Sequence, residues 1–181
     1  MVYIFLANGF ETIEALAPVD ILKRAGVEAV TVGVGGKVIV SAQNIPVTAD
    51  ITADKISLDD SLDMIVLPGG MPGTLNLEAD SSVQAAIDCC VKNDKYIGAI
   101  CAAPSILGHK GLLDGKEAIC YPGFEKDLTG AVISEKYVVQ DGKIITARGA
   151  GVCVDFGLKL AEVLTSVEKA QSVREGIQCQ K

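Results

Sequence analysis

Several features that would support common protein classes are scarce or missing in this sequence of 181 residues. His109 is the only histidine, which makes a histidine-rich metal site improbable. The six cysteines form no C-x-x-C pair and none of the spacings typical of zinc sites. No apolar run reaches the ~18 residues that a membrane helix requires. We therefore expect no metal and no membrane span.

The chain also lacks an excess of basic residues. Lys and Arg total 16 against 23 Asp and Glu, giving a formal net charge of −7. A general basic surface for nucleic acid is therefore not expected, and anionic membranes are disfavoured for the same reason. No basic segment or small-residue cleavage site marks the first residues as a secretory signal. We expect a cytoplasmic protein with reduced thiols and no nucleic-acid or membrane partner.

Apolar residues are plentiful, at 49% of the chain, and they form strand-like and helix-like segments in alternation. This pattern predicts one domain over residues 1–181, with a mainly parallel sheet covered by helices on both faces. The predicted strands are 2–7, 27–34, 37–42, 45–48, 64–67, 96–100, 118–120, 137–140 and 143–147. The predicted helices are 11–25, 82–93, 102–107, 152–164 and 167–178, the first with a kink or restart at Pro18.

Ligands of such folds bind beyond the carboxyl ends of the strands, which selects three loops. Cys101 directly follows a predicted strand and is surrounded by small residues, as in a nucleophile elbow. The partial positive charge of a helix N-terminus would favour its thiolate. The alternative is a buried structural cysteine, and we adopt that interpretation for the other five thiols.

The other two loops offer backbone amides and a carboxyl group. Gly69 and Gly70 end a strand, and the amides of Gly70 and Ala102 are candidates for an oxyanion hole. Glu14 is a candidate catalytic residue because its loop must meet the other two. The alternative is an ordinary acidic residue, since acids are common in the first turn of any helix.

Four segments together resemble the ThiJ/PfpI superfamily, in the subgroup of the Parkinson disease protein deglycase and its bacterial relatives. The segments are Glu11-Thr12-Ile13-Glu14 with Pro18-Val19-Asp20, Val66-Leu67-Pro68-Gly69-Gly70, Ala99-Ile100-Cys101-Ala102-Ala103-Pro104, and Thr146-Ala147-Arg148-Gly149-Ala150-Gly151 before Asp155-Phe156. The resemblance covers nearly the whole chain. It implies a flavodoxin-like three-layer sandwich related to class I glutamine amidotransferases, and usually a homodimer, for which Ala15, Val19 and Leu22 are candidate contacts unless the core claims them.

The resemblance also implies roles for individual residues. Cys101 matches the reactive cysteine and Glu14 the carboxyl group that hydrogen-bonds its sulfur, while Gly69, Gly70 and Ala102 match the amides of the anion pocket. The protease-like branch has a histidine at Ala102, and the animal deglycase has one at Tyr121. His109 lies eight residues after Cys101, ~12 Å along a helix, so the local sequence builds no Cys–His dyad and peptidase activity is doubtful.

Two further residues are candidates for a substrate pocket, each with a structural alternative. The hydroxyl of Tyr121 could orient a substrate oxygen, or the ring could simply pack. Arg148 could bind an anion at a helix start, or form an ion pair.

We interpret the chain as an enzyme without metal or organic cofactor. Cys101 would attack a small dicarbonyl such as methylglyoxal, Glu14 would move a proton, and lactate would leave. The resemblance also implies protein deglycase activity. The alternative is a non-enzymatic oxidative-stress sensor or redox-regulated chaperone in which Cys101 becomes a sulfinate. Because two like charges repel, the pKa of Glu14 should lie above ~4.3 and that of Cys101 below ~8.5.

Overall fold

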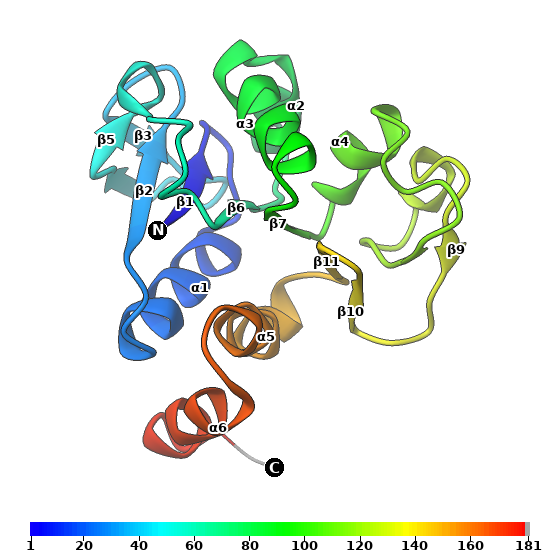
Figure 1. Cartoon of the computed structure of the whole chain (residues 1–181). Coiled ribbons are helices and arrows are strands. Elements are labelled where there is room, and N and C mark those ends of the chain that lie inside the picture. Colours follow the sequence, from blue (N-terminus) through cyan, green and yellow to red (C-terminus); the bar gives the residue numbers. More distant parts are fainter. Residues whose placement is uncertain (180–181) are drawn as a thin grey trace.

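A seven-stranded sheet forms the centre of the computed structural model, which describes residues 1–179 (Figure 1). Its strand order is β10-β11-β7-β6-β1-β2-β5, and every pair is parallel except β10 with β11. The strands are β1 (Val2–Leu6), β2 (Ala29–Gly33), β5 (Ile51–Thr52), β6 (Met64–Leu67), β7 (Tyr96–Ile100), β10 (Val138–Asp141) and β11 (Ile144–Ala147). Two small sheets join β3 (Val38–Val40) to β4 (Pro46–Thr48) and β8 (Glu117–Ala118) to β9 (Val132–Ile133).

Helices cover both faces of this sheet (Figure 1). One layer holds α1 (Thr12–Arg24), α5 (Cys153–Leu164) and α6 (Val167–Gly176), and the other holds α2 (Gly73–Ala79), α3 (Ser81–Lys92) and α4 (Pro104–His109). Short 3-10 turns occur at η1 (Ala53–Lys55), η2 (Glu125–Asp127) and η3 (Ala150–Val152). The predicted three-layer α/β arrangement is confirmed. Residues 180 and 181, which close the predicted domain, lie outside the described part.

The central strands are apolar throughout because both of their faces are buried. In β1, Tyr3 and Phe5 enter the hydrophobic cluster beneath α3, whereas Val2, Ile4 and Leu6 enter the cluster shared with α1 and α5. Side chains alternate between the faces of a strand, so a continuous apolar run fills two cores at once. This explains why the short run after Met1 is recognisable as a buried strand.

Helix α1 continues through Pro18 as one element, so of the two outcomes expected at this residue the restart does not occur. Pro18 is buried, and α5 approaches it where Gly157 lacks a side chain: a Cβ there would lie 3.2 Å from the Pro18 Cα. Packing against α5 therefore holds the helix together despite the lost hydrogen bond. Ala15 and Leu22 are fully buried in the same cluster, so the core takes these two candidate dimer contacts.

None of the helices in residues 1–179 combines the length and the apolar character needed to cross a membrane.

Candidate active site

Cys101 sits on a sharp turn at the carboxyl end of β7. Its φ of +64° lies in the left-handed region, which a non-glycine residue seldom adopts. Backbone hydrogen bonds fix the turn on both sides: the Cys101 N–H donates to the Ala147 carbonyl at 2.9 Å, and the Cys101 carbonyl accepts from the Tyr121 N–H at 2.8 Å. The predicted elbow is present, but α4 begins at Pro104 rather than at residue 102.

The three predicted loops meet at Gly69. A Cβ on this residue would lie 2.7 Å from the Cys101 Cβ and 2.8 Å from Glu14 Oε2. Any side chain here would therefore collide with both candidate catalytic groups. The absence of a side chain at Gly69 is what allows the loop after β6 to bring the thiol and the carboxyl group together.

Glu14 is fully buried in the first turn of α1. Its Oε2 accepts a hydrogen bond from the Gly69 N–H at 2.9 Å, whereas Oε1 has no hydrogen-bond partner among residues 1–179. Burial raises the pKa of Glu14 to about 7, against the lowering effect of hydrogen bonds from Cys101 and Gly69. The predicted direction is confirmed, and near neutral pH this carboxyl group can both hold and release a proton.

Cys101 departs from its predicted ionisation. Burial, followed by the charge and hydrogen bond of Glu14, raises the pKa of the Cys101 thiol to about 12, although the Ala102 and Gly70 amides lower it. The prediction of a pKa below ~8.5 is therefore wrong. It relied on a helix N-terminus at the sulfur, but α4 is only six residues long and starts three positions later.

Glu14 and Cys101 consequently titrate as a coupled pair. Because the pKa of Glu14 is about 7 and that of Cys101 about 12, the pair loses one proton near neutral pH and keeps the second until strongly basic pH. Above pH 7 a carboxylate thus stands beside a thiol and can accept its proton as the sulfur attacks. This is the arrangement of a nucleophile with its general base.

Backbone amides complete the site in a slightly different way from the prediction. The backbone amides of Ala102 and Gly70 lower the pKa of the Cys101 thiol, the effect expected of groups that form an anion pocket. The Gly69 amide is instead occupied by Glu14, so Gly69 is not a free donor for an oxyanion. Gly70 has a φ of +90°, and a Cβ there would lie 2.4 Å from the Glu11 backbone nitrogen. Only glycine fits this position.

A cavity of about 400 Å³ lies beside the elbow and contains both candidate pocket residues. Its lining is Tyr121, Pro122, Tyr137, Arg148, Gly149, Ala150, Gly151 and Val152. The ring of Tyr121 is half exposed, so it is not simply a core residue. Tyr137 was missed by the sequence analysis, because a tyrosine at the start of a hairpin strand carries no signal that it faces a pocket.

His109 and the five cysteines other than Cys101 lie outside the candidate active site. His109 is exposed at the end of α4, and its Nδ1 lies 2.6 Å from Glu78 Oε1. Cys90, Cys120 and Cys153 are buried, as expected of core cysteines. Cys89 and Cys179 are only partly buried, so the expectation of a buried structural cysteine is wrong for these two thiols.

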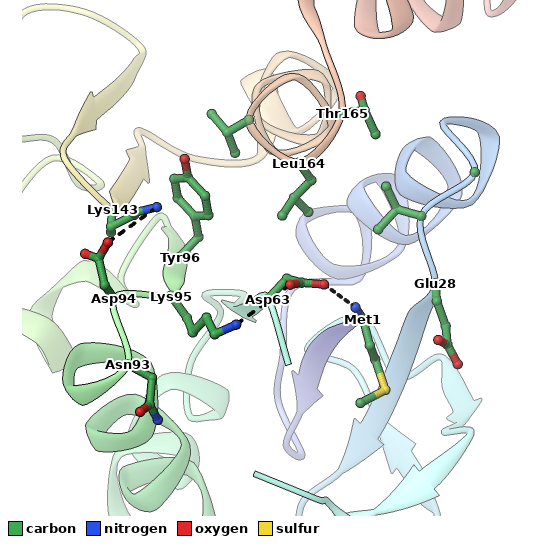
Figure 2. Close-up of a pocket in the computed structure, with 13 residues that line it drawn as sticks. Met1, Glu28, Asp63, Asn93, Asp94, Lys95, Tyr96, Lys143, Leu164 and Thr165 are labelled. Carbon is green, nitrogen blue, oxygen red and sulfur yellow. Dashed lines mark hydrogen bonds and ion pairs between the residues drawn. The ribbon is translucent and has the colours of Figure 1, made fainter. Parts of the chain in front are cut away.

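A larger cavity, of about 590 Å³, lies at the opposite edge of the sheet, where the strands begin (Figure 2). It contains none of the predicted site residues, and most of its charged groups are already paired. The Met1 amino group pairs with Asp63, and Lys143 pairs with Asp94 while covering the Tyr96 ring. Within residues 1–179, no group of three or more His, Cys, Asp or Glu side chains could hold a metal ion.

Comparison with known proteins agrees with this geometry. Residues 1–163 match the DJ-1/PfpI family. Protein dj-1beta of Drosophila melanogaster is 33% identical over 96% of this chain and 94% of its own, and a glutathione-independent glyoxalase of Caenorhabditis elegans is 28% identical over 90% and 87%. A cysteine-to-alanine mutant of a DJ-1 superfamily protein from Salmonella typhimurium superimposes with a TM-score of 0.93 at 32% identity, covering 99% and 98% of the two chains. The chain therefore belongs to the DJ-1/PfpI family and has its flavodoxin-like fold.

Proposed function

We propose that the chain is a cysteine-dependent enzyme that converts small reactive dicarbonyls to hydroxy acids, with methylglyoxal giving lactate. The observation that carries the proposal is the contact between Cys101 and the buried Glu14, whose pKa of about 7 lets it accept and return protons. Glutathione-independent glyoxalase activity in the Caenorhabditis elegans relative supports the same reaction class. The chemistry needs neither a metal nor an organic cofactor.

The reaction has three stages: addition of the thiol, proton transfer between the two carbons, and hydrolysis. Cys101 adds to the aldehyde carbon, its proton passes to Glu14, and the new oxyanion of the hemithioacetal is held by the amides of Gly70 and Ala102. Glu14 returns that proton to the oxyanion, and then takes the proton of the former aldehyde carbon and delivers it to the neighbouring ketone carbon by way of an enediol. The hydroxyl proton of the first carbon moves to the ketone oxygen at the same time, so the first carbon is oxidised and the second reduced. The resulting thioester is hydrolysed by water, which frees lactate and the thiol.

Peptidase chemistry is not supported by the same residues. A cysteine peptidase needs a base that can later protonate an amine leaving group, a role usually filled by histidine. His109 is engaged with Glu78 at the far end of α4 instead. The homodimer and the cytoplasmic location expected from the sequence stay predictions.

The direct test is lactate formation from methylglyoxal by wild type and by Cys101→Ser. We expect the variant to lose at least ~100-fold in kcat/KM, because a serine hydroxyl is far less nucleophilic than a thiol with a base beside it. Cys89→Ser is the matched control, since it changes a partly buried thiol on α3 that is not part of the site. Equal turnover by wild type and Cys101→Ser would overturn the proposal.

One observation favours a second role, as an oxidation sensor. Glu14 Oε1 is buried, lacks a partner among residues 1–179 and belongs to a carboxyl group that is protonated below about pH 7. A protonated carboxyl could donate to a sulfinate on Cys101, which forms when two molecules of hydrogen peroxide each deliver one oxygen and leave as water. Mass spectrometry after mild peroxide should find two added oxygens at Cys101 and none at the buried Cys90, Cys120 and Cys153. Indiscriminate oxidation of all these thiols would count against a sensor.

A further inference from the structure

Arg148 is a half-buried cation that forms no ion pair with any of residues 1–179. Its guanidinium lies over the ring of Tyr137, 5.4 Å from the ring centre, and no carboxylate of residues 1–179 lies within ion-pair distance of it. Partial burial costs a charged group part of its hydration, which natural proteins usually offset with an opposite charge. The alternative raised by the sequence, a structural ion pair, is therefore not what the structure contains.

Backbone hydrogen bonds place the pocket that holds Arg148 next to the elbow, although Cys101 is not among its lining residues. Arg148 follows Ala147, whose carbonyl accepts the Cys101 N–H, and the N–H of Tyr121 on the opposite wall donates to the Cys101 carbonyl. Gly149 lies against the Tyr121 ring, where an added Cβ would be 3.3 Å from it. Two backbone hydrogen bonds thus link the walls of the pocket to the residue that carries the nucleophile.

The size of this pocket does not match a three-carbon substrate. A cavity of about 400 Å³ falls in the range of ordinary small-ligand sites. Methylglyoxal bound at Cys101, which lies next to this cavity and not in its lining, would be too short to reach the guanidinium and would leave it unpaired. Two tyrosine rings and one cation form a lining suited to a short apolar stem that ends in an anion.

We propose, on the basis of the function argued above, that Arg148 selects 2-oxo aldehydes whose tail carries a carboxylate. The aldehyde reacts at Cys101, the methylene stem lies between Tyr121 and Tyr137, and the carboxylate pairs with the Arg148 guanidinium. Arginine suits this task because its planar fork binds a carboxylate through two parallel hydrogen bonds. The ion pair forms in a partly desolvated pocket, where it is stronger than on the open surface.

The first test compares two substrates that differ only in tail charge, 4,5-dioxopentanoate and its methyl ester. The measured quantity is the ratio of their kcat/KM values, which does not depend on how much enzyme is folded. We expect wild type to favour the acid, and Arg148→Met to reduce that preference about 10- to 100-fold, the equivalent of one charge-assisted hydrogen-bonded pair. Arg148→Lys should retain part of it. Arg24→Met, which removes an exposed arginine paired with Asp20, is the control and should keep the wild-type ratio.

A second measurement separates this inference from the proposed function. Cys101 is alkylated with 3-maleimidopropionate and with uncharged N-ethylmaleimide, and the ratio of rates is followed by peptide mass spectrometry. Arg148→Met should lower the ratio even if no dicarbonyl is turned over, in which case only the proposed reaction fails. If wild type and Arg148→Met show the same substrate ratio and the same alkylation ratio, the carboxylate subsite is wrong, whatever the enzyme does with methylglyoxal.

Discussion

Glu14→Gln should lower kcat for methylglyoxal about 100- to 10,000-fold, the usual contribution of a positioned general acid or base. Glutamine has nearly the same shape, and its carbonyl oxygen can still accept the hydrogen bond from the Gly69 N–H. The amide cannot, however, take the proton from Cys101 or carry one between the substrate carbons. The loss should therefore appear in kcat rather than in KM.

The pH dependence of Cys101 alkylation shows whether Glu14 acts on this thiol. In wild type the rate should rise through about pH 7, where Glu14 loses its proton and becomes able to accept the one on sulfur. In Glu14→Gln this step should vanish, and the rate should rise only at higher pH, as the thiol itself ionises. Glu11→Gln, which removes a carboxylate from the same loop but leaves Glu14 in place, should keep the step. A step near pH 7 that survives in Glu14→Gln would show that another group bears this proton.

Much of the fold is recognisable in the sequence because its signals are local. The strand ending at Leu67 is a pure apolar run, and Asp80 is a good helix N-cap, which in the structure accepts hydrogen bonds from the Ser82 and Val83 N–H groups. Helix α2, over Gly73–Ala79, was not predicted, because it begins at a glycine and has no apolar stripe. Its only fully buried large side chain is Leu77.

In the candidate site, too, the features that depend on neighbours in the chain could be predicted and those that depend on tertiary contacts could not. The small residues around Cys101 are required by the turn itself, so the elbow could be predicted from neighbours in the chain. The ionisation of Cys101 depends on burial by loops that are distant in sequence, and a local argument from the helix end gave the wrong direction. Whether Arg148 forms an ion pair likewise depends on the tertiary structure, since no pattern in the sequence shows which carboxylates lie near it.

Glu14→Gln should also make the protein more stable than wild type at alkaline pH. The gain in the free energy of unfolding should be about 2–3 kcal/mol larger at pH 8 than at pH 5. The folded state holds the Glu14 proton up to about pH 7, whereas the unfolded chain releases it near 4.5. Between these values the folded state binds more protons, so wild-type stability falls as pH rises, and above pH 7 the cost of the buried carboxylate is fully present. Glutamine carries no such charge at any pH.

Thermal unfolding at pH 5 and pH 8 measures this effect, which for a chain of 181 residues corresponds to a shift in Tm of about 5–10 °C. Glu14→Gln should therefore lose activity and gain stability at the same pH, the combination expected when a buried charge is kept for catalysis. Glu11→Gln should retain most of the wild-type slope, because the carboxyl group of Glu14 is still present. If Glu14→Gln and wild type change in stability in parallel from pH 5 to pH 8, then Glu14 does not hold its proton up to neutral pH, and it cannot be the group that passes protons between Cys101 and the substrate.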